Sequence, residues 1–213
     1  MQYKAEICLP VAQQIRQAVH ILAHGGIVAF PTETCYGLAV DPWNEKALQR
    51  LFQIKNRPAH KPVLLLIHDR ILLDSLVSTI PEKYKKLMDT YWPGPLTLIF
   101  PAHKSLSRYL TGGTETVGIR ISPNPLAMAL CRFFNSAITA TSANLSGQPS
   151  ARRASEIVDV FGKNVDYVLD EGGETLAGRC STIIGLENGN LLLLRSGVVE
   201  VPGIRQKNLS IHI

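Results

Sequence analysis

Residues 27–38 read IVAFPTETCYGL, an apolar run that ends at Pro31 and is followed at once by a polar turn. An apolar run of this length between glycines and a proline is typical of a short buried strand. The turn behind it gathers two hydroxyls, a carboxylate, a phenol and a glycine. A ligand loop at a strand end and an ordinary threonine–glycine turn are both compatible with these residues. Cys35 has no histidine near it in sequence, so we expect an inert thiol.

The rest of the chain alternates between helical spacing and short apolar runs. Helices are predicted over Val11–Leu22, over the stretch from Asn44 to Phe52, and over Pro81–Tyr91, Leu126–Phe134 and Ala154–Phe161. Further strands are predicted over Val63–Ile67, Leu96–Phe100, Val117–Ile121, Ala137–Ala140, Tyr167–Leu169, Thr182–Ile184 and Leu191–Leu194. Residues 187–190, ENGN, are typical of a hairpin, which an all-parallel sheet would not contain. We therefore expect an α/β (α+β) protein with one central mixed sheet and helices on it.

Composition excludes several classes of protein. The 213 residues are 46% apolar and 18% charged, with 22 Lys+Arg against 17 Asp+Glu and a net charge of +5. These values exclude a disordered chain, a collagen and a coiled coil, and they favour one large domain over residues 1–213. The mild positive excess suggests an anionic ligand without proving one. Because the apolar runs are too short to cross a bilayer and the N-terminus lacks a signal-peptide core, we expect a soluble, cytoplasmic protein without membrane contact.

The four cysteines, at positions 8, 35, 131 and 180, form no C-x-x-C pair. They therefore indicate neither a zinc site nor a disulfide framework. The motifs of P-loop NTPases, dinucleotide-binding folds, zinc proteases and serine hydrolases are also absent from the sequence.

Basic and hydroxyl-bearing residues cluster at predicted element ends. Lys55, Arg57 and Lys61 lie within seven positions at a helix C-terminus, where they either complement the helix dipole or clamp a polyphosphate. Residues 141–147, TSANLSG, form either a phosphate-binding loop or an ordinary turn. Arg120 lies in an apolar strand and Arg195 ends another. A buried arginine needs an anionic partner, either an acidic residue of the protein or a substrate.

Taken in order, these segments resemble the YrdC-like family of threonylcarbamoyl-AMP synthases. The resemblance rests on PTETxYGL at 31–38, KxRP at 55–58 with Lys61-Pro62, PGPLT at 93–97, GxR at 118–120, TSANxSG at 141–147, ST at 181–182 and RxG at 195–197. It covers about residues 10–200, which would form the core of a single YrdC-like domain. The implied fold is a twisted mixed sheet flanked by helices, with a basic concave cavity. The chain looks like the short, single-domain form of the family.

The resemblance implies a nucleotidyltransferase that joins L-threonine, bicarbonate and ATP into threonylcarbamoyl-AMP and pyrophosphate. Its product serves the N6-threonylcarbamoyladenosine modification at position 37 of tRNAs that read ANN codons. The implied catalytic residues are Lys55, Arg57, Ser142 and Asn144. The implied ATP ligands are Arg57, Lys61, Thr116, Ser142, Ser150 and Arg195, and the implied threonine ligands are Thr34, Arg120, the backbone at Ala140, and Ser181.

The resemblance also implies a cofactor and partners. Mg²⁺ would arrive with ATP and be held through phosphates and water rather than by protein ligands. The product would pass to a tRNA threonylcarbamoyl transferase complex of the TsaB, TsaD, TsaE type, and weak binding of tRNA is compatible with this role.

Three positions depart from the family pattern: Asn56 replaces a usual glycine, Ser122 a proline, and Gly185 an acidic residue. The main alternative function is an RNA-binding module of the same fold without synthase activity, although the sequence carries no RNA-binding motif. A carbamoyl-adenylate enzyme of hydrogenase maturation and a YciO-like paralogue are further alternatives.

Overall fold

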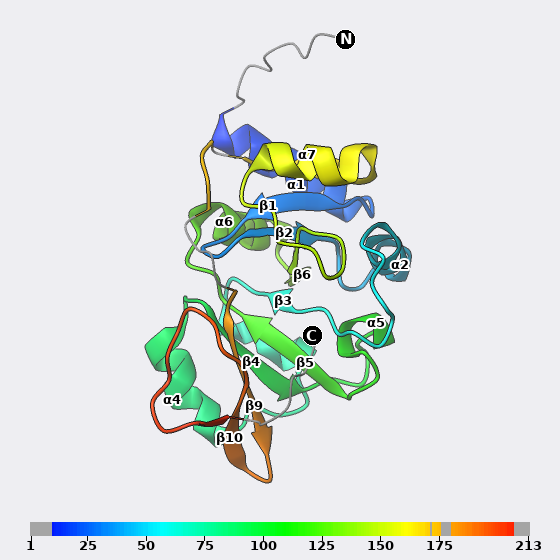
Figure 1. Cartoon of the computed structure of the whole chain (residues 1–213). Helices are drawn as coiled ribbons and strands as arrows, with labels where there is room; N and C mark the ends of the chain where they lie inside the picture. Colours follow the sequence, from blue (N-terminus) through cyan, green and yellow to red (C-terminus); the bar gives the residue numbers. More distant parts are fainter. Residues whose placement is uncertain (1–9, 171, 176–179, 207–213) are drawn as a thin grey trace, which may run out of the picture.

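The computed structural model describes residues 10–170, 172–175 and 180–206. Its strands form two mixed sheets (Figure 1). The smaller sheet has the strand order β7 (Thr141–Ser142), β2 (Tyr36–Ala39), β1 (Val28–Pro31), β8 (Tyr167–Val168). The larger has the order β11 (Arg205–Gln206), β10 (Asn190–Arg195), β9 (Thr182–Glu187), β4 (Leu96–Pro101), β5 (Thr116–Arg120), β3 (Leu65–Leu66), β6 (Ile138–Thr139). The mixed α/β class is confirmed, but the strands divide between two sheets where one was expected.

The second sheet exists because the polar turn after β1 is a hairpin turn. Strands β1 and β2 pair antiparallel, with Pro31 opposite Tyr36. The Thr32 hydroxyl donates to Cys35 O at 2.7 Å and accepts from the backbone N–H of Thr34 at 3.2 Å. These bonds satisfy the polar groups of a tight reversal, so the chain returns as β2 beside β1.

One segment connects the two sheets. Strand β6 pairs with β3 in the larger sheet, and three residues later β7 pairs with β2 in the smaller one. Ala140 lies between them and donates its N–H to Leu64 O at 2.8 Å. The buried Thr139 hydroxyl donates to Leu38 O and accepts from Val40 N–H at 2.9 Å. The junction is therefore held by hydrogen bonds to both sheets.

Five helices were predicted and all five form: α1 (Val11–Ala23), α2 (Glu45–Ile54), α4 (Glu82–Tyr91), α6 (Pro125–Phe134) and α7 (Ala154–Phe161). Asn44 caps α2 as expected, its Oδ1 accepting from Ala47 N–H at 3.1 Å. The predicted hairpin joins β9 and β10, where Asn188 and Gly189 both have positive φ. The structure adds the four-residue helices α3 (Leu73–Leu76) and α5 (Arg108–Thr111), and the 3₁₀ turns η1 (Arg70–Leu72) and η2 (Gly162–Asn164).

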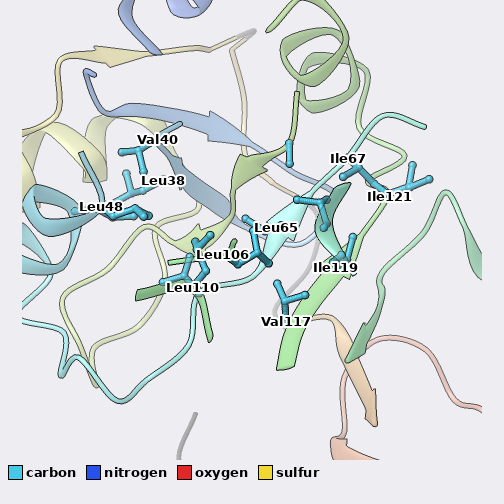
Figure 2. Close-up of a cluster of buried hydrophobic side chains, with 14 of the residues drawn as sticks. Leu38, Val40, Leu48, Leu65, Ile67, Leu106, Leu110, Val117, Ile119 and Ile121 are labelled. Carbon is cyan, nitrogen blue, oxygen red and sulfur yellow. The ribbon is translucent and has the colours of Figure 1, made fainter. Parts of the chain in front are cut away.

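A continuous apolar core crosses the junction of the sheets. Figure 2 shows Leu38 of the smaller sheet and Leu65 and Ile119 of the larger sheet within one buried cluster. A second cluster packs α1 and α6 against β1, with Ile15, Phe30 and Leu130 almost fully buried. Close packing of this kind fixes the two sheets relative to one another. Within the described residues, no helix combines the length and the apolar character needed to span a membrane.

Candidate active site

A cavity lies where the two sheets meet, and we call it the junction cavity. Its empty volume, including open solvent at the mouth, is about 650 Å³. The hairpin of the smaller sheet contributes residues 32 and 34–37, and the crossing segment contributes residues 140–142. The larger sheet contributes Arg120 and Arg195, and the segments next to its strands and to α2 contribute residues 57, 62, 64, 180 and 181. Seven of the twelve predicted site residues line it: Thr34, Arg57, Arg120, Ala140, Ser142, Ser181 and Arg195. Sequence segments more than 150 residues apart therefore converge on one cavity.

Arg120 has the acidic partner that a buried arginine requires. Its Nη1 donates to Oε1 of Glu33, which belongs to the hairpin turn before β2. The other carboxylate oxygen of Glu33 accepts from the Ser122 hydroxyl at 2.5 Å. Both side chains of the ion pair are largely buried. Of the two partners that the sequence left open for Arg120, the protein carboxylate is present, while the guanidinium still lines the cavity.

Arg195 and Ser181 form a second group on the wall contributed by the larger sheet. Arg195 donates from Nε and Nη2 to Ser181 O at 3.1 and 2.9 Å, and from Nη2 to Ser181 Oγ at 3.0 Å. Behind them Thr97 Oγ1 lies 2.9 Å from Ser181 Oγ. Burial lowers the pKa of Arg195. The group therefore holds a cation and a hydroxyl in fixed positions at the edge of the cavity.

Arg57 donates hydrogen bonds to the backbone of the loop that follows it. Its Nε donates to Lys61 O at 3.2 Å and its Nη2 to Pro62 O at 2.7 Å, while its guanidinium lies 6.0 Å from the centre of the Phe52 ring. Burial lowers its pKa too. These contacts hold the planar cation at the cavity wall.

Lys55 lies behind the wall rather than on it. It is 1% exposed, and its Nζ donates to Ser142 O at 2.5 Å and to Asn144 O at 2.6 Å. Burial, and secondarily the neighbouring Arg57, lowers its pKa to about 7. In this geometry Lys55 holds residues 141–147, the TSAN loop, in place. The cluster of basic residues at positions 55–61 did not suggest this role.

The side chains of the TSAN loop also bond to one another. The Ser142 hydroxyl donates to Asn144 Oδ1 at 2.5 Å. The Asn144 amide in turn donates to Leu145 O and Gln148 O. Ser142 lines the cavity, whereas Asn144 fixes the loop from behind.

A family model described as telomere recombination, covering Sua5, YciO and YrdC, matches residues 20–197. The chain belongs to this family. The threonylcarbamoyl-AMP synthase of Pyrococcus abyssi is 39% identical over 193 residues, which cover 91% of this chain and 56% of that protein. The threonylcarbamoyl-AMP synthase of Idiomarina loihiensis is 41% identical over 174 residues, which cover 81% of this chain and 94% of that protein. The chain thus spans little more than half of the first relative and nearly all of the second.

Solved structures agree with this membership. The crystal structure of P. abyssi Sua5 complexed with L-threonine has a TM-score of 0.88 at 36% identity, covering 94% of this chain and 61% of that one. E. coli YciO has a TM-score of 0.80 at 28% identity, covering 91% of this chain and 94% of that one. The fold expected from the resemblance is therefore confirmed as that of the Sua5/YciO/YrdC family.

The remaining predicted residues of this family site lie outside the cavity wall. Lys61 supplies the backbone carbonyl that Arg57 binds. Ser150 lies next to Cys35, whose thiol it contacts. Thr116 is at the opposite end of β5 from Arg120, about 13 Å away along the strand, and its hydroxyl bonds to that of Thr114 at 2.8 Å. The roles predicted for these residues remain predictions.

Sequence reasoning assigned no site role to several residues that line or support the cavity. Cys35 and Cys180 both line it, and burial, with a smaller contribution from Cys180, raises the pKa of Cys35. The third described cysteine, Cys131, is buried elsewhere, and Cys8 lies outside the described residues. Glu33 stood within the quoted turn, but only the fold shows that it pairs with Arg120. Thr97 lay in a quoted motif without an assigned role.

At Gly185, where the family pattern has an acidic residue, a side chain would point among apolar neighbours. A Cβ on Gly185 would lie 2.9 Å from Leu194 Cδ1 and 3.9 Å from Ile99 Cβ. A carboxylate at this position would start among apolar side chains of β4 and β10, and Gly185 does not line the junction cavity.

Proposed function

We propose that this chain is a threonylcarbamoyl-AMP synthase, which joins L-threonine, bicarbonate and ATP and releases pyrophosphate. The observation that carries the proposal is the convergence of Arg57, Arg120, Arg195, Ser142 and Ser181 on one cavity. A substrate pair with one carboxylate and a triphosphate matches cations and hydroxyls gathered in this way. The names of the relatives and the threonine complex of P. abyssi Sua5 support the same activity.

The reaction needs positioned charge more than a nucleophilic side chain. The threonine amine forms an N–C bond with bicarbonate, and water leaves, which gives a carbamate. A carbamate oxygen then attacks the α-phosphorus of ATP, and the bond to pyrophosphate breaks. Negative charge develops on the phosphate oxygens, so preorganised cations stabilise the transition state. The cavity supplies these cations, and its cysteines need take no part.

Within the cavity, each end of the substrate pair has its own partners. Arg57 and Arg195 donate to backbone carbonyls, so their positive charge is not neutralised by an acidic neighbour in those contacts and remains available to phosphates. Arg120 ends β5 and Ser181 precedes β9, and we place the threonine carboxylate beside them. Arg195, which bonds to Ser181, adjoins this end as well. Thr34 and the backbone at Ala140 complete this end.

The donor set of the cavity fits Mg²⁺ bound through ATP. Among the described residues, no group of three His, Cys, Asp or Glu side chains could hold a metal ion. Mg²⁺ prefers oxygen ligands and keeps several waters, so the phosphates of ATP would be its main ligands. The ion would supply further charge neutralisation on those phosphates.

We further propose that the labile product passes to a tRNA threonylcarbamoyl transferase complex of the TsaB, TsaD, TsaE type, with at most weak tRNA binding by this chain. The N6-threonylcarbamoyladenosine modification of tRNA would be the final product.

The deciding experiment measures pyrophosphate release from ATP and Mg²⁺, with and without L-threonine plus bicarbonate. We expect release only when both are present, together with threonylcarbamoyl-AMP in the mass spectrum. Turnover that ignores threonine contradicts the proposal. Binding of tRNA that weakens steeply with salt, without any turnover, favours the RNA-binding alternative instead.

A further inference from the structure

Thr97 lies behind the wall of the junction cavity, where its side chain contacts Ser181, a residue of that wall. It belongs to β4, is 0% exposed and does not line the cavity. Its Oγ1 lies 2.9 Å from Oγ of Ser181, which is 4% exposed and does line the cavity. Strand β4 runs parallel to β9, and Ser181 directly precedes the first residue of β9, so the contact lies at the end of this strand pair.

The direction of the Thr97–Ser181 hydrogen bond follows from the neighbouring donors. Arg195 Nη2 lies 3.0 Å from Ser181 Oγ, and a guanidinium can only donate, so Ser181 accepts from Arg195. One proton lies between the two hydroxyl oxygens. If Ser181 supplied it, the proton of Thr97 would have no acceptor within the part of the chain that the structure describes. A buried donor without an acceptor is costly, so Thr97 is the donor.

This assignment leaves the proton of Ser181 free to point into the cavity. Ser181 Oγ accepts from both Arg195 and Thr97, so its own O–H faces the open side. We propose that Thr97 is a positioning residue, which fixes Ser181 as a hydrogen-bond donor to an acceptor atom of the substrate. Together with the nearby Arg120, this donor selects a carboxylate oxygen over an amide N–H. The inference rests on the proposed function and deepens it, because it names how the amino-acid carboxylate is selected.

The test compares Thr97→Val, which keeps the shape and removes the hydroxyl, with Thr97→Ser, which restores it. We expect Thr97→Val to raise the KM for L-threonine about 3- to 10-fold, because the Ser181 hydroxyl is no longer locked in one rotamer. The KM for ATP should change less than about twofold, and Thr97→Ser should return the threonine KM close to that of the wild type. Should the valine variant fail to fold, Thr97→Ala carries the same expectation.

The matched control is Tyr84→Phe. Tyr84 is 0% exposed, and its hydroxyl donates to Ile99 O of the same strand β4 at 2.8 Å, away from the cavity. It should lose stability without a selective change in threonine KM. An unchanged threonine KM in Thr97→Val, or an equal rise in the KM of both substrates, overturns the positioning role. Failure of the wild type to turn over threonine would instead overturn the proposed function, so the two failures are distinguishable.

Discussion

Two regions around the junction cavity hold their cations with different partners, backbone carbonyls in one and a carboxylate in the other. In residues 55–58, the KNRP segment, Arg57 and Lys55 donate to backbone carbonyl oxygens. Elsewhere on the cavity wall, Arg120 pairs with the carboxylate of Glu33, which Ser122 also contacts. A carbonyl dipole orients a cation without cancelling its charge, whereas a carboxylate cancels it.

The difference supports our proposal that each region binds a different part of the substrate pair. Uncancelled charge near Arg57 suits a polyphosphate, whose several negative oxygens need a strong local field. Arg120 is already neutralised, so it offers geometry more than charge and suits a single carboxylate. The position of the cations that donate to backbone carbonyls is therefore more informative than the net charge of +5.

The largest effect should come from breaking the carbonyl-bound side with Arg57→Ala. We expect the KM for ATP to rise by about 100-fold, because charged hydrogen bonds of about 1.5–3 kcal/mol each are lost at the phosphates. The KM for threonine should rise much less. Steady-state pyrophosphate release at varied ATP and varied threonine measures both values.

Arg50→Ala is the control for this change. Arg50 binds Asp166 at 2.6 Å and does not line the cavity. It should leave the KM for ATP unchanged even though an ion pair is lost. If Arg57→Ala instead unfolds the protein while Arg50→Ala does not, the KNRP segment is structural and the comparison of the two regions fails.

The next effect tests the neutralised side through Glu33→Gln, which keeps the shape and removes the charge. Arg120 would then be buried against a neutral amide, and we expect the free energy of unfolding to fall by about 1–3 kcal/mol. Chemical denaturation measures the loss. The exposed pair of Arg70 and Asp89 provides the control, because Asp89→Asn should cost less than about 1 kcal/mol. Equal losses in both variants would show that burial of the Glu33–Arg120 pair adds nothing to the free energy of unfolding.

The sequence predicted the long elements well because their signals are local. Pro81–Tyr91 and Ala154–Phe161 carry helical spacing within their own residues, and both helices form almost as predicted. Strand β2 was missed because its first residues belong to the polar segment that was interpreted as a turn, although its partner β1 is close in sequence. Strand β7 was missed because it has only two residues and its partner β2 is about 100 residues away. A chain that pairs only through distant partners leaves no periodic signal of its own.

The same limit applies to the candidate site. Residue types predicted basic and hydroxyl-bearing clusters that could bind an anion, and the resemblance named seven of the residues that line the cavity. It could not predict that the ammonium of Lys55 turns to carbonyls 87 and 89 residues away, or that Glu33 lies beside Arg120. These contacts depend on how two sheets meet, which no single segment encodes.

The smallest expected effect is a pH dependence caused by Lys55. Its pKa in the folded protein is about 7, well below the ordinary value of a lysine, because the ammonium is buried. Between pH 6 and pH 8 the unfolded chain keeps this proton while the folded protein releases it. Folding stability therefore rises with pH in this window, by about 1 kcal/mol from this group.

Lys55→Met removes the titrating group, and its stability should lack this rise. Denaturation curves for both proteins at pH 6, 7 and 8 measure the difference between their slopes, in which other titrating groups cancel. The variant should also be less stable at each pH, because Ser142 O and Asn144 O lose their shared donor. Parallel slopes would mean that the two carbonyls keep Lys55 charged throughout, so that carbonyl dipoles alone suffice to hold a buried cation beside the cavity.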